Sequence, residues 1–123
     1  MRTIFISSFL LLFIISVQAQ QTVGLFNNSN DAFDGYTLFA PIRSDTTYLI
    51  DNCGEKVHQW SSNYKPGLSV YLMDDGSILR SGRLGNAGSS FGIVEQIDWN
   101  NNVIWSYSVQ ATYCRQHHGI VPL

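Results

Sequence analysis

Residues 68–80 read LSVYLMDDGSILR and have the pattern of an antiparallel β-hairpin. Two runs rich in aliphatic, β-branched and aromatic side chains, Leu68–Met73 and Ser77–Arg80, flank the turn residues Asp74-Asp75-Gly76. The Asp-Gly pair tolerates the positive φ that a tight hairpin needs, and the flanking runs suit a half-buried pleated surface. This stretch therefore predicts two strands that pair with each other.

The same pattern continues on both sides of this hairpin. Further strands are predicted at Tyr36–Ala40, Thr46–Ile50, Lys56–Ser61, Ile93–Asp98 and Asn102–Tyr107. Asp- and Asn-rich turns are predicted at residues 51–54 and 100–102, and the glycine-rich residues 82–92 predict one long loop. Because no stretch after residue 20 has the period of an amphipathic helix, we expect an all-β protein made of antiparallel hairpins.

The chain also aligns with itself. Tyr48–Asp51, followed by Gly54, Val57 and Trp60, corresponds to Glu95–Asp98, followed by Asn101, Val103 and Trp105. Ser69–Met73 corresponds in the same way to Gly119–Leu123. The two offsets, 47 and 50 residues, are similar enough to indicate a repeat. About four strands per ~40–50 residues is typical of a β-propeller blade, and a β-sandwich with similar hairpins is the alternative.

The length is too short for a whole propeller. Propellers have about four to eight blades, and residues 20–123 hold only about two. The last five residues have the pattern of the first strand of a further repeat. We therefore expect an incomplete propeller, the N-terminal part of a larger protein.

The composition excludes two classes of protein. With 45% hydrophobic, 13% aromatic and only 13% charged residues, the chain is too apolar to be disordered. Seven Lys and Arg against nine Asp and Glu give a net charge of −2, which argues against a nucleic-acid binder.

The first 19 residues have the features of a secretory signal peptide. Arg2 precedes an apolar run from Ile4 to Val17, and Val17-Gln18-Ala19 fits a cleavage site. The run is shorter than the roughly 20 residues that span a bilayer as a helix, although a retained anchor is the alternative. We expect export to the periplasm or medium, no membrane association after cleavage, and a mature N-terminal segment at residues 20–34. In such a compartment Cys53 and Cys114 could form a disulfide, and the sequence leaves their pairing open.

His117 and His118 are the sharpest candidate site residues. Adjacent residues of a strand point to opposite faces, so the pair is poorly suited to share a metal. A single histidine facing a propeller channel could act as an acid, a base or a nucleophile, while an exposed pair is the plainer alternative. The chain lacks the standard phosphate, hydrolase and zinc motifs, and we expect no cofactor or metal.

Other residues have a structural interpretation beside a functional one. His58 is predicted to be structural, and Asp51 and Asp98 to fix their turns. Arginines at positions 43, 80, 83 and 115 could bind an anion, although scattered arginines usually lie on the surface. The tryptophans Trp60, Trp99 and Trp105 could stack on a ligand but are more often packed between sheets.

As a set in one order, these motifs resemble the arylsulfotransferase family over residues 35–123. The residues that carry the resemblance are Gly35–Pro41, Thr47–Gly54, Val57–Trp60, Pro66-Gly67, Tyr71–Arg80, Ile97–Trp99, Val103–Tyr107 and His117-His118 before Ile120, Pro122 and Leu123. The resemblance implies a six-bladed propeller and an exported bacterial enzyme. Such an enzyme moves a sulfuryl group from a phenolic sulfate ester donor to a phenol acceptor, without a nucleotide donor, through a transiently sulfated histidine.

The resemblance assigns His118, and next His117, to the active site, where His118 helps to hold or protonate the substrate. Two departures matter. Gly119 stands where the family usually has an aspartate, and the sulfated histidine and sulfate-binding arginine belong to later blades. The chain alone is therefore expected to be inactive. A non-catalytic propeller that binds a ligand or protein, and a truncated product without function, are the alternatives.

Overall fold

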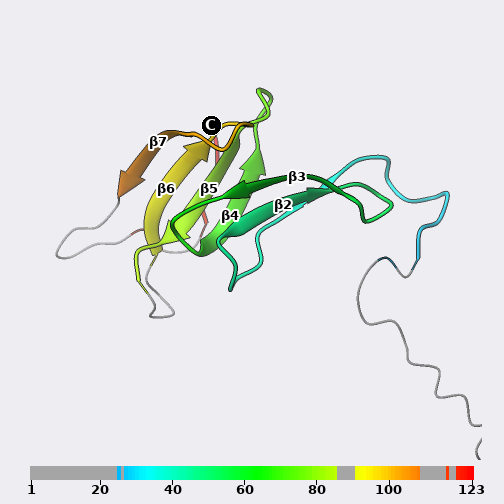
Figure 1. Ribbon diagram of the computed structural model, residues 1–123, viewed down its shortest axis with the longest axis horizontal. Coiled ribbons are helices and arrows are strands. Elements are labelled where there is room, and N and C mark those ends of the chain that lie inside the picture. Colours follow the sequence, from blue (N-terminus) through cyan, green and yellow to red (C-terminus); the bar gives the residue numbers. More distant parts are fainter. Residues whose placement is uncertain (1–24, 26, 86–90, 109–115, 117–118) are drawn as a thin grey trace, which may run out of the picture.

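The computed structural model describes residues 25, 27–85, 91–108, 116 and 119–123. All regular structure in this part of the chain is β (Figure 1), and no helix there is long and apolar enough to cross a membrane. The strands are β1 (Thr37–Phe39), β2 (Thr46–Ile50), β3 (Lys56–Ser61), β4 (Pro66–Leu72), β5 (Ile78–Arg83), β6 (Phe91–Ile97) and β7 (Val103–Ser108). Each overlaps one of the seven predicted runs, so the all-β prediction is confirmed.

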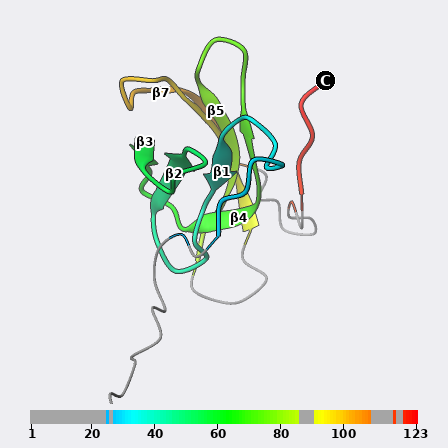
Figure 2. The same ribbon diagram turned by 90° about the vertical axis from the view of Figure 1, so that its right-hand side faces the viewer.

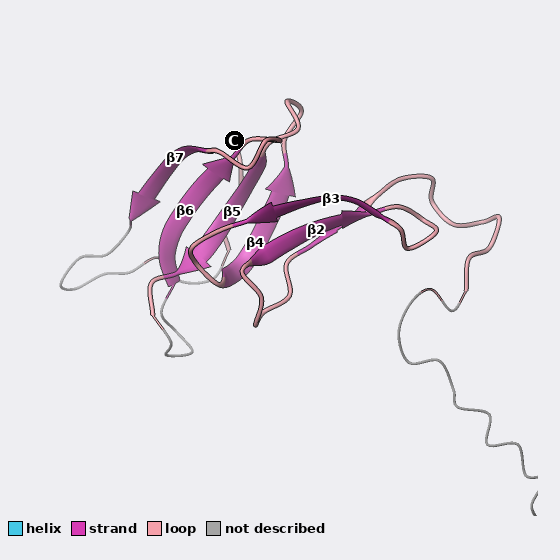
Figure 3. Ribbon diagram, in the orientation of Figure 1, coloured by secondary structure: helices cyan, strands magenta, loops and turns pink. Residues whose placement is uncertain are grey.

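The strands form two antiparallel sheets. β1-β2-β3 make a three-stranded sheet and β4-β5-β6-β7 a four-stranded one, with every strand beside its neighbour in sequence. Figures 1 and 3 show β2 and β3 running across β4, with the four-stranded sheet behind them. Because neighbours in sequence are neighbours in the sheet, short turns suffice to connect them.

Three of these turns have the same hydrogen-bonded geometry. In the β2–β3 turn the Asp51 amide donates to the Glu55 carbonyl, and the Gly54 amide donates to the Asp51 carbonyl, both at 3.0 Å. The β4–β5 and β6–β7 turns repeat this pattern, starting at Met73 and Asp98. The fourth residue always has positive φ, at Gly54 (79°), Gly76 (79°) and Asn101 (68°). A turn closed by one left-handed residue is a common hairpin connection, and the predicted turns are confirmed.

The hairpins β2–β3 and β6–β7 are the same unit repeated 47 residues apart. The pairs of the first are Ile50–Lys56, Leu49–His58, Tyr48–Gln59, Thr47–Trp60 and Thr46–Ser61. The pairs of the second are Ile97–Val103, Gln96–Trp105, Glu95–Ser106, Val94–Tyr107 and Ile93–Ser108. A register irregularity also falls at the same place in both hairpins, next to Ile50 and next to Ile97.

This register corrects part of the sequence self-alignment. The match of Asp51 with Asp98 holds, but Trp60 corresponds to Tyr107 and not to Trp105, whose counterpart is His58. Val57 near the start of β3 and Ile104 near the start of β7 have no partner in the strand pairing. The sequence alignment therefore placed Val57 one residue out, on the wrong face, and Trp60 two residues out, on the correct face but opposite the wrong partner.

β1 is the counterpart of β5, so the three-stranded sheet contains no counterpart of β4. β1 pairs with β2 through Thr37–Ile50, Leu38–Leu49 and Phe39–Tyr48, and β5 pairs with β6 through Ile78–Ile97, Leu79–Gln96 and Arg80–Glu95. Since Ile50 and Ile97 are counterparts, so are β1 and β5. The three-stranded sheet thus repeats β5-β6-β7.

The core lies between the two sheets. Leu49 and Trp60 from one sheet pack with Ile78 and Ile97 from the other, and Leu38 and Val70 border the cluster. Figure 2 shows β2 and β3 on one side of β5 and the C-terminal segment on the other.

The prediction of a strand at residues 119–123 is wrong for this structure. These residues form no strand, and the Ile120 amide instead donates to the Ser69 hydroxyl of β4 at 3.1 Å. A strand needs a hydrogen-bonded neighbour, and no described strand pairs with this segment.

Candidate functional site

The interface between the two sheets brings together an aromatic cluster and a buried ion pair. An aromatic cluster occupies its edge, where β3 meets the β6–β7 turn. The His58 ring stacks on Trp99, with centroids 3.9 Å apart and planes at 10°, and Trp60 meets both rings edge-on at 4.5 and 5.5 Å. Such edge and stacked pairs stabilise a core beyond the area they bury.

His58 is fixed in this cluster by a hydrogen bond. Its Nε2 lies 2.9 Å from the carbonyl oxygen of Trp99. Because a carbonyl can only accept, Nε2 carries the proton and donates. The Ser61 amide donates to the Asn101 side chain beside it, at 2.6 Å. Both bonds join β3 to the β6–β7 turn, so His58 connects the two sheets, and its predicted structural role is confirmed.

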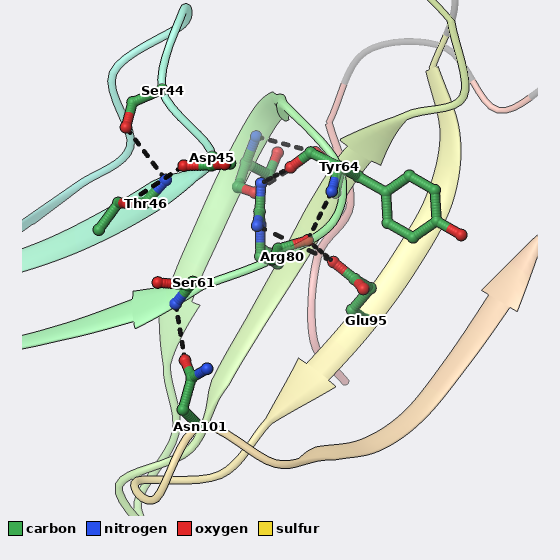
Figure 4. A network of polar contacts seen from close by, with 11 residues as sticks. Ser44, Asp45, Thr46, Ser61, Tyr64, Arg80, Glu95 and Asn101 are labelled. Atoms are coloured by element: carbon green, nitrogen blue, oxygen red, sulfur yellow. Dashed lines mark hydrogen bonds and ion pairs between the residues drawn. The ribbon is translucent and has the colours of Figure 1, made fainter.

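A buried ion pair lies deeper in the same interface (Figure 4). Arg80 of β5 and Glu95 of β6 are cross-strand partners, 1% and 2% exposed. Arg80 Nη1 lies 3.9 Å from Glu95 Oε2, and Nη2 donates to the Tyr64 carbonyl at 2.9 Å. The Ser62 hydroxyl donates to Glu95 Oε2 at 2.7 Å and accepts from the Tyr64 amide at 3.0 Å. These contacts hold the β3–β4 connection against the four-stranded sheet.

Burial acts on the charge of Arg80. Removal from water lowers the pKa of its guanidinium from the ordinary value, while the negative charges of Glu95 and Asp45 partly oppose that shift. An arginine remains protonated across the accessible pH range. The interior therefore holds a permanent cation that is neutralised by Glu95.

The arginines do not behave alike. Arg43 is exposed on the loop after β1, as a surface arginine should be, whereas Arg80 is 1% exposed and cannot offer its guanidinium to a solute at the surface. Arg115 lies outside the described residues. An exposed anion site at Arg80 is therefore excluded, and its guanidinium is part of the interface between the sheets.

The sequence contains a signal for this buried pair. Arg80 and Glu95 continue the alternating rows of Ile78 and Ile97, whose side chains are fully buried. Charged residues in phase with core residues on two neighbouring strands indicate a buried pair.

The opposite face of the four-stranded sheet carries a chain of polar contacts. The Trp105 indole donates to Gln96 at 2.7 Å, Gln96 donates to the Ser77 hydroxyl at 2.8 Å, and Ser77 donates to Asp75 at 2.6 Å. Trp105 and its neighbour on the same face, Tyr107, are 40% and 64% exposed. Inter-sheet packing of the tryptophans is thus confirmed for Trp60, which is 1% exposed, but not for Trp105. Trp99 contacts His58 and Trp60 across the interface but is itself 43% exposed.

The candidates His117 and His118 lie outside the described residues, as does Cys114. Gly119, which follows His118 in the sequence, lies against β4, where an added Cβ would come within 2.8 Å of the Ser69 hydroxyl. Cys53 is exposed in the β2–β3 turn. Among the described residues no group of three or more acidic, histidine or cysteine side chains could hold a metal.

Comparison with known proteins gives no match: no family model fits the chain, and no curated protein or solved structure is significantly similar to it.

Proposed function

We propose that this chain forms consecutive blades of a β-propeller of the arylsulfotransferase type. The observation that carries the proposal is that the packing positions of the first sheet recur on the outer face of the second sheet. The face of β1-β2-β3 that is buried against the second sheet carries Leu38, Thr47, Leu49, His58 and Trp60. Its counterparts by register are Leu79, Val94, Gln96, Trp105 and Tyr107, on the outer face of the four-stranded sheet.

This arrangement favours a propeller over a sandwich. In a sandwich the two sheets bury their inner faces against each other and turn their outer faces to solvent. Here one face of the second sheet packs against the first sheet. Its other face carries the counterparts, by register, of the residues with which the first sheet packs. A unit that packs front to back in this way repeats around an axis, as blades do.

Two further features support the order of strands within a blade. All six residues of β7 are exposed, as expected for an outermost strand. β4, at the other edge of the sheet, lies beside both β1 and residues 119–120, which suits an innermost strand next to its neighbours around a channel. Gly119 and Ile120 both lie against Ser69 of β4.

The resemblance to the arylsulfotransferases is what supports a catalytic role for His118, with His117 second. In the proposed reaction an imidazole nitrogen of a later blade attacks the sulfur of a phenolic sulfate ester, and the S–O bond to the phenolate breaks. His118 gives a proton to the departing phenolate oxygen. The acceptor phenol then attacks the sulfur, the S–N bond breaks, and the phenolic proton passes to a base. We propose export by a signal peptide at residues 1–19 as the route to this substrate.

The test is sulfuryl transfer by the complete gene product. p-Nitrophenol should be released from p-nitrophenyl sulfate only when phenol is present, and His118→Ala should lower the rate about 10²–10⁴-fold, the usual contribution of general acid–base catalysis. His58→Phe is the matched control, because it keeps an aromatic ring on Trp99 outside the proposed site and should leave the rate unchanged. A folded protein without phenol-dependent release would instead be a binding propeller.

A further inference from the structure

A hollow of 370 Å³ lies at the end of the four-stranded sheet where β4 begins and β5 ends. Six residues line it: Asn63, Tyr64, Lys65, Arg83, Leu84 and Gly85. Its volume is within the range of about 300–1,000 Å³ typical of small-molecule sites. All nine acidic residues of the chain belong to the part that the structure describes, and none of them lines this hollow. By contrast, a hollow of 390 Å³ beside the β2–β3 turn has Asp34 and Asp51 in its lining and no cation.

The two cations of the first hollow lie opposite each other across the β4–β5 pair. Pro66 pairs with Gly82, and at the next position the Arg83 amide donates to the Lys65 carbonyl at 2.9 Å. Directly opposite residues of antiparallel strands have Cβ atoms about 4.5–5.5 Å apart, and like charges in that arrangement are destabilising. A bound anion would lower this repulsion, because it supplies the negative charge that the lining of the hollow lacks.

The charged residues between Lys65 and the end of β7 are also segregated by sign. The acidic residues of the two tight turns, Asp74, Asp75 and Asp98, lie at one end of the four-stranded sheet. Lys65 and Arg83 lie at the opposite end. The remaining two form the buried ion pair described above and neutralise each other. A charge distribution of this polarity directs anions toward the end of the sheet that holds the hollow.

The wall of the hollow that carries Lys65 is held in place by the interior of the protein. The Tyr64 carbonyl accepts from Arg80 at 2.9 Å, and the Tyr64 amide donates to the Ser62 hydroxyl at 3.0 Å. Tyr64 also lies against β5, since a Cβ added at Gly82 would come within 3.1 Å of the Tyr64 Cβ. A site whose walls are fixed before binding loses less conformational entropy when it takes a ligand.

We propose that Lys65 and Arg83 form a binding site for a tetrahedral sulfur oxyanion, either inorganic sulfate or the sulfur oxyanion group of an aryl compound. The planar guanidinium of Arg83 donates to two oxygens of such a group, and the Lys65 ammonium adds a second positive charge. Tyr64 lines the same hollow, and Figure 4 shows its ring directed away from Arg80, so it can pack against an aryl group. These residues are distinct from His117 and His118, so the site does not depend on the transfer reaction.

NMR titration of the complete protein, labelled with ¹⁵N-lysine and ¹⁵N-arginine, tests the site. Inorganic sulfate and benzenesulfonate are the probes, since sulfuryl transfer does not cleave the C–S bond of a sulfonate. The amide signals of Lys65 and Arg83 should shift together and saturate at the same probe concentration. Tighter binding of benzenesulfonate, with that gain lost in Tyr64→Leu, would identify an aryl oxyanion as the ligand. Equal affinities for the two probes would identify the free oxyanion.

Variants of the two cations separate a site from general attraction of anions. Arg83→Gln should weaken binding about tenfold or more, as expected for loss of hydrogen bonds to a charged group, and Lys65→Gln, at an exposed position, should weaken it several-fold. Arg83→Lys should lie between Arg83→Gln and the parent, because it keeps the charge and loses the fork. Arg43→Gln is the matched control, since Arg43 is exposed on the β1–β2 loop, and it should bind like the parent.

Two results would overturn the proposal. One is a shift of the Lys65 and Arg83 signals that does not saturate with either probe. The other is equal affinity in Arg83→Gln, Lys65→Gln and Arg43→Gln. Neither result bears on sulfuryl transfer, which release of p-nitrophenol measures separately, so failure of this site and failure of the proposed function are distinguishable.

Discussion

The sheet β1-β2-β3 and the strands β5-β6-β7 share one pairing register but carry different side chains at equivalent positions. Where the first has Phe39 stacked on Tyr48, the second has the ion pair of Arg80 and Glu95. The aromatic pair lies on an open face, and the charged pair lies inside the interface. Hairpin turns and alternation therefore set the backbone of the repeated unit, while the surface that packs against it determines which side chains are tolerated.

The largest effect is expected when one charge of the buried pair is removed. Arg80→Ala leaves Glu95, only 2% exposed, without its cation. Removing one partner of a buried pair costs about 3–5 kcal/mol, so the free energy of unfolding, measured with urea, should fall by that amount.

The double variant Arg80→Met/Glu95→Leu is the matched control. Replacing both charges by apolar side chains of similar size is often neutral or stabilising, and we expect a stability within about 1 kcal/mol of the parent. A double variant as unstable as Arg80→Ala would contradict the view that the unpaired charge is the cause, and would make side-chain shape or the Tyr64 contact decisive instead.

A second prediction concerns the aromatic cluster. Trp60 is 1% exposed and contacts both His58 and Trp99. Truncation of a buried tryptophan costs about 3–5 kcal/mol, and we expect the lower end for Trp60→Ala because it lies at the edge of the interface. Val57→Ala on the same strand, where Val57 is 43% exposed, should cost less than about 0.5 kcal/mol. Equal losses in the two variants would show that the cluster does not hold the sheets together.

A third prediction separates the two equivalent turns. Gly54 and Asn101 both have positive φ, but only the Asn101 side chain accepts a hydrogen bond from Ser61 on the other sheet. Asn101→Gly keeps the backbone conformation and removes that bond, so stability should fall by about 1 kcal/mol. Gly54→Asn should change stability by less than about 0.5 kcal/mol, since asparagine tolerates this conformation. Thermal unfolding of the two single variants measures the difference.

The smallest expected effect is on the dependence of stability on pH. A side-chain hydrogen bond from Asn102, then a backbone bond from the same residue, lowers the pKa of Asp98. A carboxylate with a lowered pKa stabilises the fold above its unfolded value, near 3.8, and that contribution is lost as pH falls through the folded value. Asp98→Asn should therefore flatten the loss of stability below about pH 4. An unchanged acid transition would exclude Asp98 as a contributor.

Much of this fold could be predicted from local sequence. The Asp-Gly and Asn-rich turns and the β-rich runs between them gave all seven strands, because such signals act within a few residues. The turn roles of Asp51 and Asp98 followed for the same reason, and each accepts amide hydrogen bonds within its own turn. The site residues His117 and His118 rest on the family resemblance and remain predictions.

The strands, their turns and the repeat could all be recognised from the amino-acid sequence. The folded structure was needed to establish that Trp60 is the counterpart of Tyr107 and that His58 joins the two sheets. Strands and turns can be recognised in this way because turn residues and alternation are local properties of the chain. Burial and pairing of a side chain depend on which distant strand packs over it, and one residue of irregular register changes the face on which it lies.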